Sequence, residues 1–132
     1  MPSKKILNPD WPRSASADFA QGIQVAQTIY VSGQVAQAAD GSLVGEGDME
    51  AQARQVFSNI EAVLALGGAT LHDIVRITTY VTDMSQYAGY AKVRKELFPR
   101  ADIASATVSS PLLVRAGFLI EIEATAIVGS AR

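Results

Sequence analysis

The sequence predicts an α+β domain in which two helices pack on one face of a mixed β-sheet. The first observation is a pair of stretches in which apolar residues recur at helical spacing, one starting at Met49 and one following Asp83. The second is a set of β-branched stretches with alternating side chains, of which residues 74–81 and 118–128 are the clearest. Their order, strand-strand-strand-helix-strand-helix-strand-strand, predicts that fold class.

The chain has 132 residues, which favours a single domain spanning residues 1–132. Hydrophobic residues make up 48% and charged residues 18%, a balance typical of a globular protein with one core. No apolar stretch reaches the roughly 20 residues that a membrane span requires. The apolar part after Lys5 is cut short at Asn8, so no signal peptide is expected. These observations predict a cytoplasmic protein that does not bind membranes.

The first three strands are expected at residues 5–7, 23–26 and 28–32. Asp48 is a candidate helix N-cap, and Gly67-Gly68 is a typical helix end. Gln52 and Asn59 are expected on the outer faces of the helix between them. Its inner face is expected to carry Ala53, Val56, Phe57, Ile60, Val63 and Leu64.

Asp83 is the expected N-cap of the second helix, which Pro99 ends. The expected inner stripe of this helix is Tyr87, Tyr90, Val93, Leu97 and Phe98. In strand 74–81 the alternation puts Ile74, Arg76, Thr78 and Tyr80 on one face. The last two strands are expected at residues 104–109 and 118–128. Several strands carry apolar residues on both faces, and the two helices can cover only one face of the sheet. The other face is therefore expected to contact another copy of the chain.

Composition excludes several kinds of chemistry. The chain has no cysteine and one histidine, His72, so disulfides, thiolate nucleophiles, sulfur-based zinc sites and multi-histidine metal sites within one chain are ruled out. The formal net charge of −2 argues weakly against a nucleic-acid partner. His72 is expected on the surface, and the basic cluster Lys92, Arg94, Lys95 and Arg100 is expected to be a solvated helix face.

Two features could carry chemistry. Glu121 and Glu123 lie two residues apart on the last strand and therefore point to the same face. One of them could position water or exchange a proton in a pocket, or both could lie on an exposed strand face with no role. In Ser32-Gly33-Gln34, the glycine at the strand end could let backbone approach a ligand or could be an ordinary turn residue.

These stretches, in this order, resemble the RidA family, also called the YjgF or L-PSP family. The matching residues are 19–21, 29–34, 63–69, 73–84 and 120–124, and together they span most of the chain from about residue 19 to 128. The resemblance implies a chorismate-mutase-like protomer and a homotrimer whose strands form a central barrel, with three ligand clefts between subunits.

Active members of the family hydrolyse reactive enamines and imines to a 2-keto acid and ammonia without a metal or organic cofactor. An arginine binds the substrate carboxylate, and a glutamate with backbone groups near the strand-end glycine positions water. By this resemblance the glutamate corresponds to Glu121, and the strand-end motif to Ser32, Gly33 and Gln34. The family's pocket tyrosine corresponds to Phe19, which keeps the ring and loses the hydroxyl.

Two further positions depart from the family pattern. The family's helix asparagine falls on Ala91, and its arginine falls on Ser105, or on Ala104 if the loop before the last strand is longer. Losing a charge-assisted bond of about 1.5–3 kcal/mol should weaken binding of small 2-imino acids tenfold to a hundredfold or more. Arg13 and Arg115 are candidates to replace the missing cation.

The sequence therefore predicts a trimer with small-molecule clefts. The favoured function is deaminase-type hydrolysis of a small enamine or imine other than the usual 2-imino acids. A non-catalytic protein that binds or senses a small metabolite is the alternative, and an endoribonuclease-like translation inhibitor is the weakest possibility, given the acidic balance of charge.

Overall fold

The computed structural model describes residues 3–132 and contains one six-stranded sheet. Its strands lie in the order β1-β2-β3-β6-β4-β5. β4 and β5 are parallel, and all other neighbouring strands are antiparallel. The strands are β1 (Lys5–Leu7), β2 (Gly22–Val25), β3 (Thr28–Val35), β4 (Ile74–Val81), β5 (Ala104–Ser109) and β6 (Ile120–Ile127).

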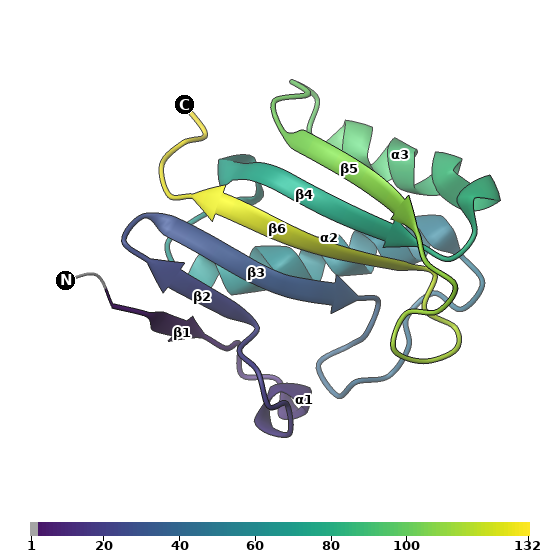
Figure 1. Ribbon diagram of the computed structural model, residues 1–132, viewed down its shortest axis with the longest axis horizontal. Helices are drawn as coiled ribbons and strands as arrows, with labels where there is room; N and C mark the ends of the chain where they lie inside the picture. Colours follow the sequence, from purple (N-terminus) through teal and green to yellow (C-terminus); the bar gives the residue numbers. More distant parts are fainter. Residues whose placement is uncertain (1–2) are drawn as a thin grey trace.

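Two helices, α2 (Met49–Leu66) and α3 (Tyr87–Leu97), lie behind the sheet in Figure 1 and leave its front face open. The α+β class with two helices on one face is thus confirmed. The chain also forms the short helix α1 (Pro12–Ala15) and the 3-10 turns η1 (Leu71–Asp73) and η2 (Met84–Gln86). Helix α1 was not predicted because four residues without a buried side chain show no periodicity. No helix within residues 3–132 is long and apolar enough to cross a membrane.

Helix α2 begins and ends where its sequence predicts. The Asp48 carboxylate accepts a hydrogen bond from the backbone N–H of Ala51 at 3.0 Å, and Gly67 is the C-cap. All six expected inner residues are buried. The expectation for Gln52 and Asn59 was wrong, because these side chains are 0% and 5% exposed. Their amides hydrogen-bond to backbone groups of nearby loops and strand ends, which compensates their burial.

Two details of the second half differ from the predictions. Asp83 caps the turn η2, where its carboxylate accepts from the backbone N–H of Ser85 at 3.0 Å, and α3 itself begins at Tyr87. Ile74 is buried rather than sharing a face with Arg76, because the pairing of β4 with β6 shifts by one residue between them. Such a bulge moves the preceding side chain to the other face.

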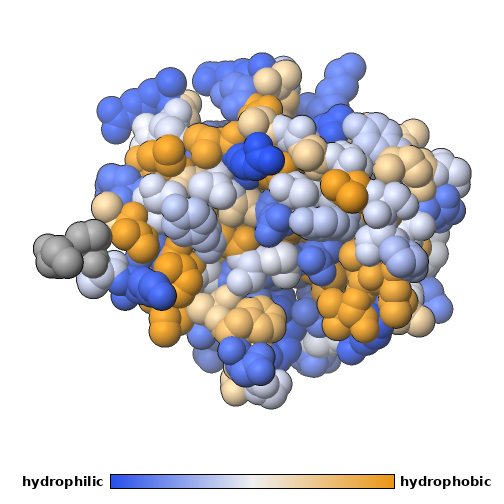
Figure 2. Space-filling view, viewed as in Figure 1, coloured by the Kyte–Doolittle hydropathy of each residue, from blue (hydrophilic) through white to orange (hydrophobic). Residues whose placement is uncertain are grey.

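The open face of the sheet is less apolar than the strand patterns predict. Figure 2 shows it as a mosaic of apolar and polar side chains. Tyr30 and Ile127 are exposed, but Arg76 and Glu123 are exposed on neighbouring strands of the same face. A cavity of about 240 Å³ lies among such residues: Tyr30, Val31, Arg76, Thr78, Glu123, Ala124 and Thr125. A partner on this face would therefore meet hydrogen-bonding groups as well as apolar surface.

One buried polar pair connects α3 to the sheet. The hydroxyls of Tyr90 and Thr79 lie 2.7 Å apart, and both residues are 0% exposed. A buried hydroxyl without a partner is costly, so each hydroxyl depends on the other.

We therefore expect Tyr90→Phe to lower the free energy of unfolding by about 1–3 kcal/mol, because it leaves the Thr79 hydroxyl unsatisfied. Urea unfolding at fixed protein concentration measures this. The double variant Tyr90→Phe/Thr79→Val removes both hydroxyls. Its loss in free energy of unfolding should be smaller than the sum of the losses in the two single variants. A strictly additive double variant would contradict the coupling.

Candidate functional site

The β3–β6 pairing is interrupted at the strand-end motif. Val31 pairs with Ala124 and Gln34 pairs with Ile122, so the intervening Ser32 and Gly33 have no assigned partner on β6. Ser32 turns instead to the segment before β2, where its hydroxyl donates to the carbonyl oxygen of Ala20 at 2.7 Å. A bulge of this kind leaves the backbone groups of Ser32 and Gly33 without partners on β6.

Gly33 leaves room at this bulge for the side chain of Glu121, which lies directly over it. A Cβ atom on residue 33 would stand 2.6 Å from Oε2 of Glu121 and 2.9 Å from its carboxyl carbon. Contacts this short do not occur between packed atoms, so any side chain at position 33 would displace the carboxylate. The missing side chain at Gly33 thus allows the observed position of the Glu121 carboxylate, and the glycine is more than an ordinary turn residue.

Glu121 and Gly33 line one cavity of about 200 Å³. It lies at the end of the sheet where β3 finishes and β6 begins, near the loop that joins β5 to β6 (Figure 1). Of the residues predicted from the sequence, this cavity brings together Phe19, Gly33 and Glu121. The remaining lining residues are Val35, Gln37, Val114, Arg115 and Phe118. Among these, only Arg115 had been singled out in the sequence.

Partial burial raises the pKa of the Glu121 carboxyl group, and the nearby negative charge of Glu123 raises it further. Glu123 itself is exposed and accepts a hydrogen bond from the Tyr80 hydroxyl at 3.1 Å, which raises the pKa of Tyr80. The two carboxylates share a strand face, as predicted, but they differ in environment. Glu121 keeps its proton to a higher pH than a free glutamate does, which suits proton exchange with a bound ligand.

Gln34 has a structural position and its side chain does not line this cavity. It is 1% exposed, and its amide donates to Oε1 of Gln21 at 2.9 Å. Its own Oε1 accepts from Arg13 at 3.4 Å, while the Arg13 Nε donates to the carbonyl oxygen of Ala38 at 3.1 Å. The Arg13 guanidinium also lies 4.0 Å from the ring centre of Trp11, and burial lowers its pKa. Arg13 is therefore held by the protein itself.

Ala91 and Ser105 lie elsewhere in the chain. They line a cavity of about 450 Å³ between α3 and β5, together with Arg94, Lys95, Phe98, Pro99, Ala101 and Ile103. Ser105 pairs with Ile77, whose side chain faces the helices, and this parallel register turns Ser105 toward α3. Arg94 is not the solvated residue predicted, because its guanidinium donates to the Tyr87 hydroxyl at 2.9 Å. The predicted site residues thus form two separate groups in one chain.

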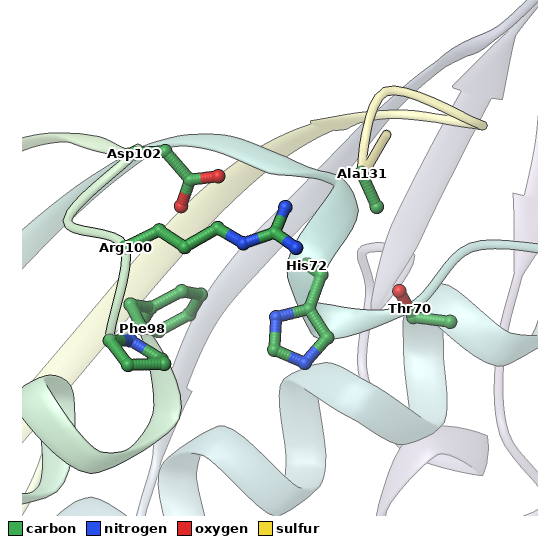
Figure 3. A pocket seen from close by; sticks show the side chains of 7 residues that line it. Thr70, His72, Phe98, Arg100, Asp102 and Ala131 are labelled. Carbon is green, nitrogen blue, oxygen red and sulfur yellow. The ribbon is translucent and has the colours of Figure 1, made fainter.

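A fourth cavity, of about 340 Å³, is shown in Figure 3. His72 is exposed, as expected, and points into the cavity beside the extended Arg100 side chain, with Asp102 beyond. None of the residues that the sequence suggested for the site lies there. Within residues 3–132, no three histidine, aspartate or glutamate side chains are grouped as metal ligands would be.

The loop that carries Val114 and Arg115 is held by one buried amide. Gln52 on α2 donates to the carbonyl oxygens of Gly117 at 2.9 Å and Gly45 at 3.1 Å, and accepts from the N–H of Leu119 at 2.8 Å. Sequence periodicity missed this role because it groups glutamine with outward-facing residues. Its spacing, three residues after Met49 and four before Val56, places it on the buried stripe of the helix and was the available signal.

Comparison with known proteins gives consistent results. The family described as Endoribonuclease L-PSP matches residues 12–128. A RutC family protein of Pyrococcus abyssi is 33% identical, with 94% of this chain and 97% of that protein covered. A mouse protein named 2-iminobutanoate/2-iminopropanoate deaminase is 31% identical over 96% of this chain and 93% of its own length.

Solved structures agree with the sequence relatives. The crystal structure of the Rid family protein YyfA from Yersinia pestis superposes with a TM-score of 0.85 at 32% identity, covering 96% of this chain and 100% of that chain. Yeast Mmf1 gives a TM-score of 0.86 at 26% identity, covering 95% and 98%. The family match over most of the chain, the shared fold and the quoted motifs lead to one conclusion: the chain belongs to the RidA (YjgF or L-PSP) family.

Proposed function

We propose that this protein hydrolyses a small reactive enamine or imine to the corresponding carbonyl compound and ammonia, with Glu121 as the catalytic acid and base. The observation that carries the proposal is the half-buried carboxylate of Glu121, seated on Gly33 in a cavity beside Phe19. Relatives named 2-iminobutanoate/2-iminopropanoate deaminase support this reaction class.

In the proposed reaction, the protonated Glu121 donates to the imine nitrogen, which makes the imine carbon more electrophilic. An enamine substrate takes that proton on carbon instead and so becomes the same protonated imine. The carboxylate then accepts a proton as water adds to the carbon and forms the new C–O bond. Returning this proton to nitrogen lets ammonia leave as the C–N bond breaks. The hydroxyl proton then passes to the carboxylate as the carbonyl group forms, so the carboxyl group ends protonated, as it began.

We further propose that complete clefts form between neighbouring copies in a homotrimer. The two groups of predicted site residues support this, because the Glu121 cavity and the α3–β5 cavity with Ser105 are distinct within one chain. The outer edge of β5 and the open face of the sheet both offer surfaces for a second copy. A copy that places its α3–β5 cavity over the Glu121 cavity of its neighbour would make one larger site.

Hydrolysis is favoured over RNA cleavage, although the family description mentions an endoribonuclease. The chain carries 11 basic and 13 acidic residues, a poor match for a polyanion. A ligand-binding protein without turnover is the remaining alternative, and the activity measurement below separates it from an enzyme.

Replacing Glu121 with glutamine removes the proposed proton exchange and keeps the size of the side chain. We expect turnover of a freshly generated imine to fall by about 10²–10⁴-fold, measured as keto acid and ammonia release above the spontaneous rate. Glu123→Gln, on the same strand face, should retain most of the turnover, because burial, the larger cause of the raised pKa of Glu121, is unchanged. Unchanged turnover in Glu121→Gln would exclude Glu121 as the catalytic group, and a wild type with no turnover would exclude the enzyme.

The raised pKa of Glu121 also predicts how stability depends on pH. Its pKa in the folded protein lies above the usual 4.5, so the folded state binds more protons than the unfolded state between these two values. Stability should therefore fall as pH rises through this window in the wild type. The melting temperature, measured across this pH range, should fall less in Glu121→Gln than in the wild type. Parallel curves of melting temperature against pH for the two proteins would contradict a raised pKa at Glu121.

The trimer is tested by light scattering coupled to size-exclusion chromatography. We expect a mass three times that of the chain, and the same mass for Glu121→Gln because its carboxylate lies at the cavity. A monomer or dimer across a wide concentration range would contradict the proposed assembly.

A further inference from the structure

We propose that Arg115 binds the carboxylate of the substrate, and that the substrate is a 2-imino acid with an apolar or aromatic side chain. This inference rests on the proposed function and identifies its substrate class. The position of the family's usual carboxylate-binding arginine is occupied here by Ser105 or Ala104, neither of which carries a charge. A cation elsewhere in the Glu121 cavity could bind the substrate carboxylate in place of that arginine.

Arg115 is the cation that lines this cavity with Glu121. Its guanidinium lies 4.7 Å from the ring centre of Phe118, and its Nη2 donates to the carbonyl oxygen of Gly41. Within residues 3–132 it makes no ion pair, so its other N–H groups are available. A guanidinium held on one side by a ring and a carbonyl can present two parallel donors to a carboxylate.

The loop that presents Arg115 is held in an unusual conformation. Val114 has φ of +67°, a left-handed backbone that a β-branched residue rarely adopts, and its side chain is 80% exposed. Gln52 holds the far end of the same loop through Gly117 and Leu119. Strain of this kind persists where surrounding contacts impose it and is frequent at binding sites. Val114 and Arg115 both line the cavity.

The other walls of the cavity indicate what the carboxylate is attached to. Apolar side chains surround Glu121 and Arg115 in the cavity: Phe19, Val35, Val114 and Phe118. Two of them, Phe19 and Val114, are exposed. These residues suit burial of a hydrocarbon or aromatic group of the ligand. An imino acid of two to four carbons would leave most of this surface uncovered.

The alternative cations are already engaged by the protein. Arg13 donates to Gln34 and Ala38 and lies on Trp11. Arg94 donates to Tyr87 and lies in the α3–β5 cavity, where its guanidinium is 5.0 Å from the Tyr90 ring centre. Neither lines the cavity of Glu121 within one chain. In the proposed trimer a neighbouring copy would bring Arg94 and Lys95 of its α3–β5 cavity to this site, and the Arg115→Met variant below separates their contribution from that of Arg115.

Binding of stable ketones tests the inference without requiring turnover. Phenylpyruvate carries the carboxylate and the ring, whereas phenylacetone replaces the carboxylate with a methyl group. We expect the wild type to bind phenylpyruvate at least tenfold more tightly than phenylacetone or 2-oxobutanoate in isothermal titration.

Arg115→Met should raise the Kd for phenylpyruvate at least tenfold and change the Kd for phenylacetone less than twofold. Arg115→Lys should give an intermediate Kd for phenylpyruvate.

The matched control is Arg100→Met, which removes an exposed arginine from the cavity of Figure 3 and should change neither affinity. Circular dichroism and light scattering confirm that each variant keeps its fold and assembly. Equal affinities of wild type and Arg115→Met for phenylpyruvate, or no preference for it in the wild type, would overturn the inference.

A parallel turnover measurement separates this inference from the proposed function. The substrate is 2-imino-3-phenylpropanoate, generated from phenylalanine by an amino acid oxidase. Arg115-dependent binding of phenylpyruvate without imine hydrolysis would retain Arg115 as a ligand-binding residue and exclude the enzyme. Hydrolysis with equal kcat/KM in the wild type and Arg115→Met would retain the enzyme and exclude the role of Arg115.

Discussion

The buried amide of Gln52 is the interaction on which the candidate site depends. From the inner face of α2 it binds Gly45 in one loop and both Gly117 and Leu119 in another, and so holds two connections that no regular ladder orders. Asn59, two turns further along the helix, holds the end of β3 through Val35 and Gln37. The helix that packs the core therefore also sets the walls of the cavity.

The second constraint is steric. Glu121 lies over the unpaired residues of β3, and the absence of a side chain at Gly33 leaves room for its carboxylate. The same arrangement removes part of the water around Glu121, which raises its pKa. One bulge thus supplies both the position and the protonation behaviour of the group proposed to exchange protons. A glycine and a glutamate nearly ninety residues apart in sequence act as one unit.

Much of the fold could be predicted because its residues repeat at regular intervals. The inner face of α2 and the alternation of β6 follow from helical and strand periods, and the caps at Asp48 and Gly67 follow from local hydrogen bonding. The predictions failed where a tertiary contact overrides a pattern. Gln52 is buried because loop groups need partners, and Ile74 changes face because β4 shifts its pairing with β6.

The candidate site divides in the same way. The sequence by itself determined the family and the position of Glu121 and Glu123 on one strand face, because both follow from residue identity and short spacing. Only the tertiary structure decided that Phe19, Gly33, Arg115 and Glu121 share a cavity while Ser105 lies apart. That outcome depends on bulges, strand register and loop anchoring, which arise from contacts between residues far apart in the chain.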